Sequence, residues 1–162
     1  MNERLKLLSS MPVFGGLNAA AITLINELAE PLSVPAGEHF FHQGDKSQTM
    51  YVLQTGRVEI YKTWHSTSKL LRHMHAGDCF GEMALIDLFP RSASALAVEP
   101  CQALQITPPI LHELYQHDLE QFTLLQMNVG REISRRLREL DELLFRAVMG
   151  ETLPESTLSG LA

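Results

Sequence analysis

The amino-acid sequence predicts a mainly β protein, built as an antiparallel jelly-roll β-barrel with helices before and after it. Between residues 32 and 107, short apolar segments alternate with turns rich in Gly, Pro and Asp. Strands of about five residues separated by such turns are typical of double-sheet barrels. Outside this range, apolar residues recur at the spacing of helices. At 162 residues, the chain has room for one domain with a substantial core.

The segment before the barrel, residues 1–31, is expected to be helical. Residues 3–10 have the pattern of a short amphipathic helix. Asn18 is a good N-cap for the run A-A-A-I-T-L-I-N-E-L-A, because its side chain can accept a hydrogen bond from a free N–H group of the first turn.

Alternation along the barrel strands predicts that one face of each strand lines the interior. The candidate strands R-V-E-I-Y-K-T-W and K-L-L-R-H-M-H follow one another in the chain. Ile60 from the first and Leu71 from the second are therefore expected to wall an interior space.

Two further helices are expected in residues 108–149. Pro108 and Pro109 begin a short helix, and a long helix runs from about Leu119 to Met149. The apolar positions of the long helix lie near a common stripe, formed by Phe122, Gln126, Val129, Ile133, Leu137, Leu140, Leu144 and Ala147. Such a stripe indicates a helix that pairs with a second copy of the chain, giving a homodimer. The alternative is a helix that packs only on its own barrel.

Composition and charge narrow the function classes. The formal net charge of −6 argues against a dedicated nucleic-acid binder, which normally has a basic face. No apolar run approaches the ~18 residues that span a bilayer, and residues 1–12 lack a signal-peptide core, so the cytoplasm is the expected compartment. Cys79 and Cys101 are too few for a disulfide framework or a metal motif. Residues 150–162 are small and polar, broken by Pro154, and are expected to be a flexible tail.

Residues 80–97, F-G-E-M-A-L-I-D-L-F-P-R-S-A-S-A-L-A, combine the groups that hold a cyclic sugar phosphate. Gly81 allows a turn where a Cβ would clash, and the Glu82 carboxylate can accept hydrogen bonds from paired hydroxyls. Arg91 supplies a fixed-charge fork suited to two phosphate oxygens. The small residues 92–95 leave room for a ligand against the backbone. The alternative is a purely structural strand-turn-strand segment that binds no ligand and in which Glu82 and Arg91 only form an ion pair.

This segment resembles the phosphate-binding cassette of cyclic nucleotide-binding domains, the family of bacterial catabolite activators and of kinase regulatory subunits. The match covers F-G-E-x-A-L, a five-residue spacer and R-S-A-x-A-x-A. The resemblance implies that Glu82 bonds the ribose 2′-hydroxyl and Arg91 the cyclic phosphate, with the N–H groups of Ala84 and Ser92 completing the cradle. The binding residues expected on this basis are Gly81, Glu82, Ala84, Leu85, Arg91, Ser92 and Ala93.

The resemblance extends to the long helix. It implies that Arg136 is a partner of Glu82, and that Leu140 and Asp141 lie near the base together with Ile60 and Leu71. Leu140 and Asp141 depart from the small polar residues found there in a catabolite activator, so base selectivity is open. Ser92, in place of the Thr associated with cGMP preference, favours cAMP over cGMP.

The sequence thus predicts a non-enzymatic, cytoplasmic cyclic nucleotide sensor without a cofactor or a metal. A counterpart of the segment that binds DNA in catabolite activators is not expected in this sequence. The expected partner is therefore a protein effector, and binding to nucleic acid or to a membrane is not expected. A second hypothesis is a protein-interaction module that keeps the fold and no longer binds nucleotide. A third is a cupin-like metal enzyme, suggested by His73 and His75 ahead of Glu82, although the spacing of these residues differs from that of cupins.

Overall fold

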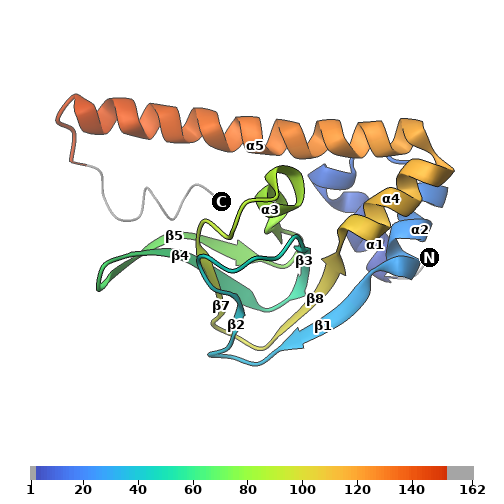
Figure 1. Cartoon of the computed structure of the whole chain (residues 1–162), viewed down its shortest axis with the longest axis horizontal. Coiled ribbons are helices and arrows are strands. Elements are labelled where there is room, and N and C mark those ends of the chain that lie inside the picture. The colour runs from blue at the N-terminus through green and yellow to red at the C-terminus, as the bar shows by residue number, and fades with distance from the viewer. Residues whose placement is uncertain (1–2, 153–162) are drawn as a thin grey trace.

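The computed structural model describes residues 3–152 and confirms the expected antiparallel jelly roll (Figure 1). Its strands form two four-stranded sheets. One sheet contains, in spatial order, β1 (Glu30–Val34), β8 (Cys101–Ile106), β3 (Met50–Thr55) and β6 (Cys79–Phe80). The other contains β2 (His39–Phe41), β7 (Ser94–Ala97), β4 (Arg57–Trp64) and β5 (Thr67–His75). The tail expected at residues 150–162 lies outside the described residues from position 153 onward.

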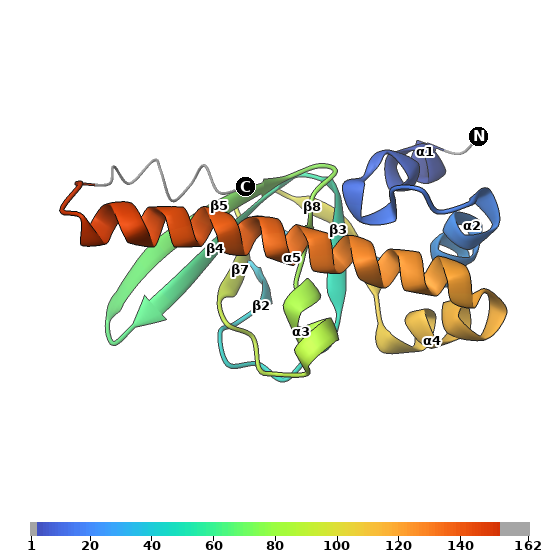
Figure 2. The ribbon, with the colours of Figure 1, turned by 90° about the horizontal axis from the view of Figure 1, so that it is seen from above.

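Helices gather at one end of the barrel and along one side of it. They are α1 (Glu3–Ser10), a 3-10 turn (Pro12–Phe14), α2 (Ala19–Leu28), α3 (Glu82–Asp87), α4 (Pro108–His117) and α5 (Leu119–Val148). Figure 2 shows α5 running from this helical end across the barrel to the β4–β5 hairpin, with α3 beside it. Among residues 3–152, no helix is both long and apolar enough to cross a membrane.

Caps fix where the main helices begin. The Asn18 side chain accepts a hydrogen bond of 2.8 Å from the Ala21 N–H group at the start of α2, as its position predicted. Asp118 accepts in the same way from the Gln121 N–H group and begins α5. Because both caps satisfy otherwise free N–H groups, the first turns of both helices are well defined.

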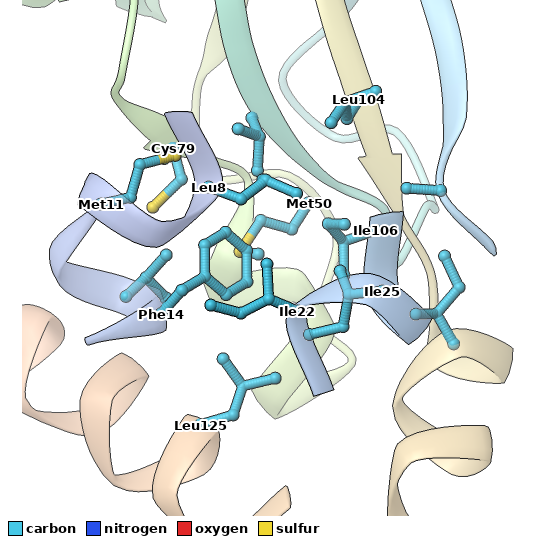
Figure 3. Packing of buried hydrophobic residues seen from close by; sticks show 14 of the residues in the cluster. Leu8, Met11, Phe14, Ile22, Ile25, Met50, Cys79, Leu104, Ile106 and Leu125 are labelled. Carbon is cyan, nitrogen blue, oxygen red and sulfur yellow. The ribbon is translucent and has the colours of Figure 1, made fainter. Parts of the chain in front are cut away.

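The first half of α5 is anchored in a hydrophobic core that lies between the helices and the β1-β8-β3-β6 sheet. Figure 3 shows Phe14, Ile22 and Leu125 converging in this core, and Phe14 and Leu125 are each only 1% exposed. The Asn128 side chain adds two hydrogen bonds to backbone carbonyls of the N-terminal segment, at Val13 and Gly15. These contacts set the position of α5 relative to the barrel.

The apolar stripe of α5 divides into two parts. Val129 is buried and Ile133 packs against the core, whereas Leu137 and Leu144 are 58% and 64% exposed. A stripe that repeats every seven residues drifts around a straight helix by about 20° per heptad, so one face cannot stay in contact with one surface. The second half of α5 therefore presents apolar side chains to the outside of the described chain.

Candidate functional site

A cavity of about 320 Å³ lies between the barrel, the 80–93 segment and α5. This volume is within the range of small-molecule pockets. Ten of the residues expected at the site line the cavity: Ile60, Leu71, Gly81, Glu82, Ala84, Arg91, Ser92, Ala93, Arg136 and Leu140. They come from β4, β5, the turn before α3, α3 itself, the loop before β7, and α5, so the cavity lies where one sheet, the cassette and the long helix meet.

Arg91 is fixed by backbone carbonyls rather than by a carboxylate. Its Nη1 donates to the Gly81 carbonyl at 3.0 Å, and its Nη2 donates to the Thr49 carbonyl at 2.6 Å and to the Ser47 hydroxyl at 3.2 Å. The guanidinium also lies over the Phe41 ring, 4.1 Å from its centroid. These contacts determine the orientation of the cation, and none of them comes from a carboxylate.

The charge of Arg91 is poorly compensated. The residue is only 4% exposed, and within residues 3–152 it forms no ion pair. Its Nε is buried and has no hydrogen-bond partner in the described chain. Burial is the largest influence on the pKa of Arg91 and lowers it, because the charged form loses its hydration. An anion in the cavity would offset this cost.

Gly81 makes this arrangement of Arg91 possible. Its φ of +82° lies in the left-handed region, which Gly adopts without steric cost. A Cβ at this position would lie 2.7 Å from the Arg91 Nη1 and 2.9 Å from the Thr49 carbonyl oxygen. The turn before α3 therefore requires Gly for two independent reasons.

Glu82, the first residue of α3, points a buried carboxylate at the same cavity. It is 3% exposed, and its Oε1 accepts a hydrogen bond from Arg136 of α5. Its Oε2 is buried without a partner among the described residues. One carboxylate oxygen is thus engaged, and the other can accept a hydrogen bond from a ligand.

Arg136 joins α5 to the cassette by pairing with Glu82, the partner that the family resemblance implied. Besides Glu82, it contacts Glu132 through Nε at 3.2 Å and the Cys79 carbonyl through Nη2 at 3.4 Å. The alternative in which Glu82 pairs with Arg91 is wrong, because Glu82 pairs with Arg136 instead.

Burial, followed by the nearby Glu82 carboxylate, raises the pKa of the Cys79 thiol to about 12, so this thiol is neutral at physiological pH.

Two of the expected site residues do not line the cavity. The Leu85 side chain belongs to the core that also contains Met50 and Ile106, because it lies on the face of α3 turned away from the cavity. Asp141 is exposed on α5, one position beyond the cavity-lining Leu140.

The structure adds cavity residues that sequence reasoning missed. They are Phe41, Arg72, Met74, Phe80, Met83, Asp87, Phe89, Pro90, Ile133 and Leu137. Several of them lie inside the 80–97 segment, so the motif in this segment could have identified them as cavity residues. Ile133 and Leu137 were assigned to the apolar stripe of α5 alone, and Arg72 was passed over because strict alternation places it on the opposite face from Leu71.

The histidines of β5 do not lie with the cavity carboxylate. His73 is near Glu59, with 3.7 Å between Nδ1 and Oε1, and His75 is near Asp78 at 4.0 Å. Glu82 contacts Arg136 instead. Within residues 3–152, no group of three or more His, Cys, Asp or Glu side chains is arranged to hold a metal ion.

The sequence model of the family described as "Cyclic nucleotide-binding domain" matches residues 31–118, a range that includes the whole cassette and most of the cavity wall. The chain belongs to this family.

Other members of the cyclic nucleotide-binding domain family share much of the chain. The "Cyclic AMP receptor protein" of Thermus thermophilus is 33% identical over 131 residues, which are 80% of this chain and 59% of the relative. The crystal structure of Thermus thermophilus catabolite activator protein matches with a TM-score of 0.76 and 31% identity, covering 85% of this chain and 63% of that one. The chain therefore spans about three fifths of the length of these relatives.

The fold of the present chain also matches a solved structure of which it covers a larger share. A cyclic nucleotide-binding domain from Methylobacillus flagellatus has a TM-score of 0.77 at 21% identity, covering 94% of this chain and 84% of that one. At this identity, the likeness concerns the fold alone.

A substitution of Gly81 tests the packing around Arg91. We expect Gly81→Ala to lower the free energy of unfolding by more than Gly77→Ala does, by roughly 1–3 kcal/mol, because only the Cβ added at position 81 meets packed atoms. Gly77 is the matched control, since its φ of +95° imposes the same backbone strain while nothing lies within 4 Å of an added Cβ. Urea unfolding of the two variants measures the difference. Equal losses would show that the close approach to Arg91 is not tight.

Proposed function

We propose that this protein is a regulatory, non-enzymatic sensor that binds a 3′,5′-cyclic nucleotide in the cavity and passes the signal to a protein partner. The observation that carries the proposal is the buried, unpaired charge of Arg91, with its unsatisfied Nε. A buried cation held by neutral carbonyls is costly until an anion joins it. The family membership supports a cyclic nucleotide as that anion.

The cassette accounts for the two polar parts of such a ligand. The cyclic phosphate would lie between Arg91 and Ser92, which forms no hydrogen bond with another residue of the described chain. The ribose 2′-hydroxyl would donate to the free Oε2 of Glu82. Apolar side chains on the remaining wall, including Ile60 and Leu71, suit the face of a base.

The same contacts offer a route for the signal. Glu82 is shared between the ligand position and Arg136, so a bound ribose changes the environment of the contact that holds α5 against the cassette. A ligand that touches both barrel and α5 favours the arrangement in which the two are closed together. The response is therefore a population shift of α5 relative to the barrel.

The exposed part of the α5 stripe supports a homodimer. Leu137, Leu140 and Leu144 are 58%, 46% and 64% exposed and lie on one face of the helix. Apolar side chains gathered in this way mark a protein-protein contact, and a parallel or antiparallel twin helix would cover them. The net charge of −6 favours a protein over DNA as the further partner.

Arg91→Ala tests the phosphate contact. We expect binding of cAMP and cGMP to weaken by tens-fold or more, because each charge-assisted hydrogen bond contributes roughly 1.5–3 kcal/mol. Calorimetric titration gives the affinities, and thermal unfolding checks that the variant folds. Arg91→Lys keeps the charge without the fork and should bind with intermediate affinity. Arg138→Ala, an exposed arginine of α5 outside the cavity, is the control. Unchanged affinity in Arg91→Ala would remove Arg91 from the mechanism.

Glu82→Gln tests the ribose contact. The variant keeps the shape and one acceptor but loses the charge, so it should weaken binding of the ribonucleotide while hardly altering binding of its 2′-deoxy analogue. The ratio of the two affinities is the measurement, because a general loss of structure would change both equally. An equal loss for both ligands would mean that Glu82 acts only by holding Arg136.

Leu144→Asp tests the dimer. An unpaired carboxylate at a twofold apolar contact costs several kcal/mol, so we expect this variant to be monomeric and the wild type dimeric in light scattering. Leu119→Asp places the same charge at the other end of α5 and should leave the dimer intact. A monomeric wild type would rule out the dimer, and sequence-selective DNA binding at moderate salt would contradict a protein partner.

A further inference from the structure

The side of α5 that faces away from the barrel has a repeat of its own, which only partly coincides with the apolar stripe. Figure 2 looks onto this side, and no other element of residues 3–152 covers it. Exposed positions recur there at alternating steps of three and four residues, which is the a/d spacing of a coiled coil. These positions, here called the outer seam, are Met127, Gly130, Ser134, Leu137, Asp141, Leu144 and Val148.

The second half of the outer seam has the composition of one strand of a parallel two-stranded coiled coil. With Met127 at an a position, Leu137 and Leu144 occupy d positions and Val148 occupies an a position. Leu at d with a β-branched residue at a favours two parallel helices. An identical helix would place Leu137 and Leu144 in layers against their own copies. A second copy of the chain is therefore the occupant that this seam fits.

The charges beside the outer seam favour the same orientation. Arg131 and Arg138 occupy e positions, and no charged residue occupies a g position between residues 126 and 148. In a parallel pair, each e position lies beside a g position of the other helix, so these cations meet uncharged side chains. In an antiparallel pair with the seams overlapped, e positions face each other, so Arg138 would lie near Arg138 of the second copy. The parallel pair avoids this repulsion.

Asp141 is the carboxylate of the outer seam, one turn after Leu137 and one turn before Leu144. Within residues 3–152, neither its carboxylate nor the Arg138 guanidinium forms an ion pair. In a parallel pair, Asp141 would meet Asp141 of the second copy, surrounded by Leu137, Leu140 and Leu144 of that copy. Arg138 of the second copy flanks the layer of Leu137 instead. Because α5 contains no His, Asp141 is the group of this seam that titrates.

We propose that Asp141 lowers the affinity of the α5 dimer at neutral pH, so that two copies of the chain associate more tightly as the pH falls. This inference rests on the homodimer of the proposed function. Two carboxylates that share an apolar layer lose hydration and repel each other. Protonation of one removes the repulsion, and the resulting acid can donate a hydrogen bond to the other. The dimer then binds more protons than two separate chains, so acid favours association.

Substitutions at position 141 measure the effect of the charge. We expect Asp141→Leu to lower the dissociation constant of the dimer at neutral pH by at least about thirtyfold, because two polar groups leave an apolar layer. Asp141→Asn keeps the shape and a polar group without the charge, so its dissociation constant should be intermediate. Sedimentation velocity over a range of protein concentrations, without nucleotide, gives the three constants.

The pH dependence separates the titration of Asp141 from its polarity. The wild-type dissociation constant should fall between about pH 7.5 and pH 5, by up to about tenfold per pH unit if one proton is taken up. Asp141→Asn and Asp141→Leu should show no such fall. Glu142→Gln is the matched control, because it removes the neighbouring exposed carboxylate, which lies outside the seam, and should keep the wild-type dependence. Circular dichroism at each pH checks that every variant is folded.

Each outcome bears on a different claim. If wild type and Asp141→Leu are both monomeric at every pH, the homodimer and this inference fail together. A dimer whose pH dependence is the same in wild type and Asp141→Asn defeats only the role of Asp141. A wild-type dimer that acid weakens would also overturn the proposal, and it would indicate an antiparallel pair in which Asp141 contacts Arg138 of the second copy. Calorimetric titration with cyclic nucleotides tests the sensor function separately.

Discussion

The site depends on one constraint, which is that backbone carbonyls hold the buried side chain of Arg91 in position. The Arg91 guanidinium is held by the carbonyls of Gly81 and Thr49, which come from the turn before α3 and the loop before β3. Each carbonyl satisfies a donor without neutralising the charge, so the position of Arg91 is fixed while its electrostatic cost remains. The absence of a Cβ at Gly81 and the aromatic face of Phe41 complete the arrangement. Neighbouring residues have little freedom to change without moving this cation.

Charge also links the layers of the fold. Glu82 on α3 and Arg136 on α5 meet in a largely buried position, and Glu132 binds the same arginine. Because one Glu82 oxygen stays unpaired, the contact between the cassette and α5 is incomplete. Much of the attraction within a buried pair of this kind offsets lost hydration, so its net contribution to stability is small. Within the described residues, Arg91 thus has partners for both of its terminal nitrogens, whereas Glu82 has a partner for one of its two oxygens.

The sequence predicted which residues gather at the cavity better than it predicted which face of its helix or strand each residue lies on. The cassette could be recognised because its residues are close in the chain and each has a distinct chemical role. Arg72 was missed because Leu71, expected to face inward, is the extra residue of a β-bulge, so strict alternation counted from Leu71 places Arg72 on the wrong face. Leu85 was placed at the site by its position in the motif, whereas the turn of α3 directs its side chain into the core. Asp141 was placed there by alignment with the family, and the rotation of α5 leaves it exposed.

The division of α5 into an anchored half and an uncovered half has a consequence for local stability. Most of the buried side chains of α5 lie in its first half, including Leu125, whereas in the second half Leu143 is buried and Leu137 and Leu144 are exposed in a single copy of the chain. Opening of the second half alone would expose fewer buried side chains than opening of the first half, and it would take Leu137 and Leu140 away from the cavity. If a twin helix covers this half, association and ligand binding stabilise the same closed segment. By linkage, the apparent nucleotide affinity then rises with protein concentration, and the ligand strengthens self-association by the same factor.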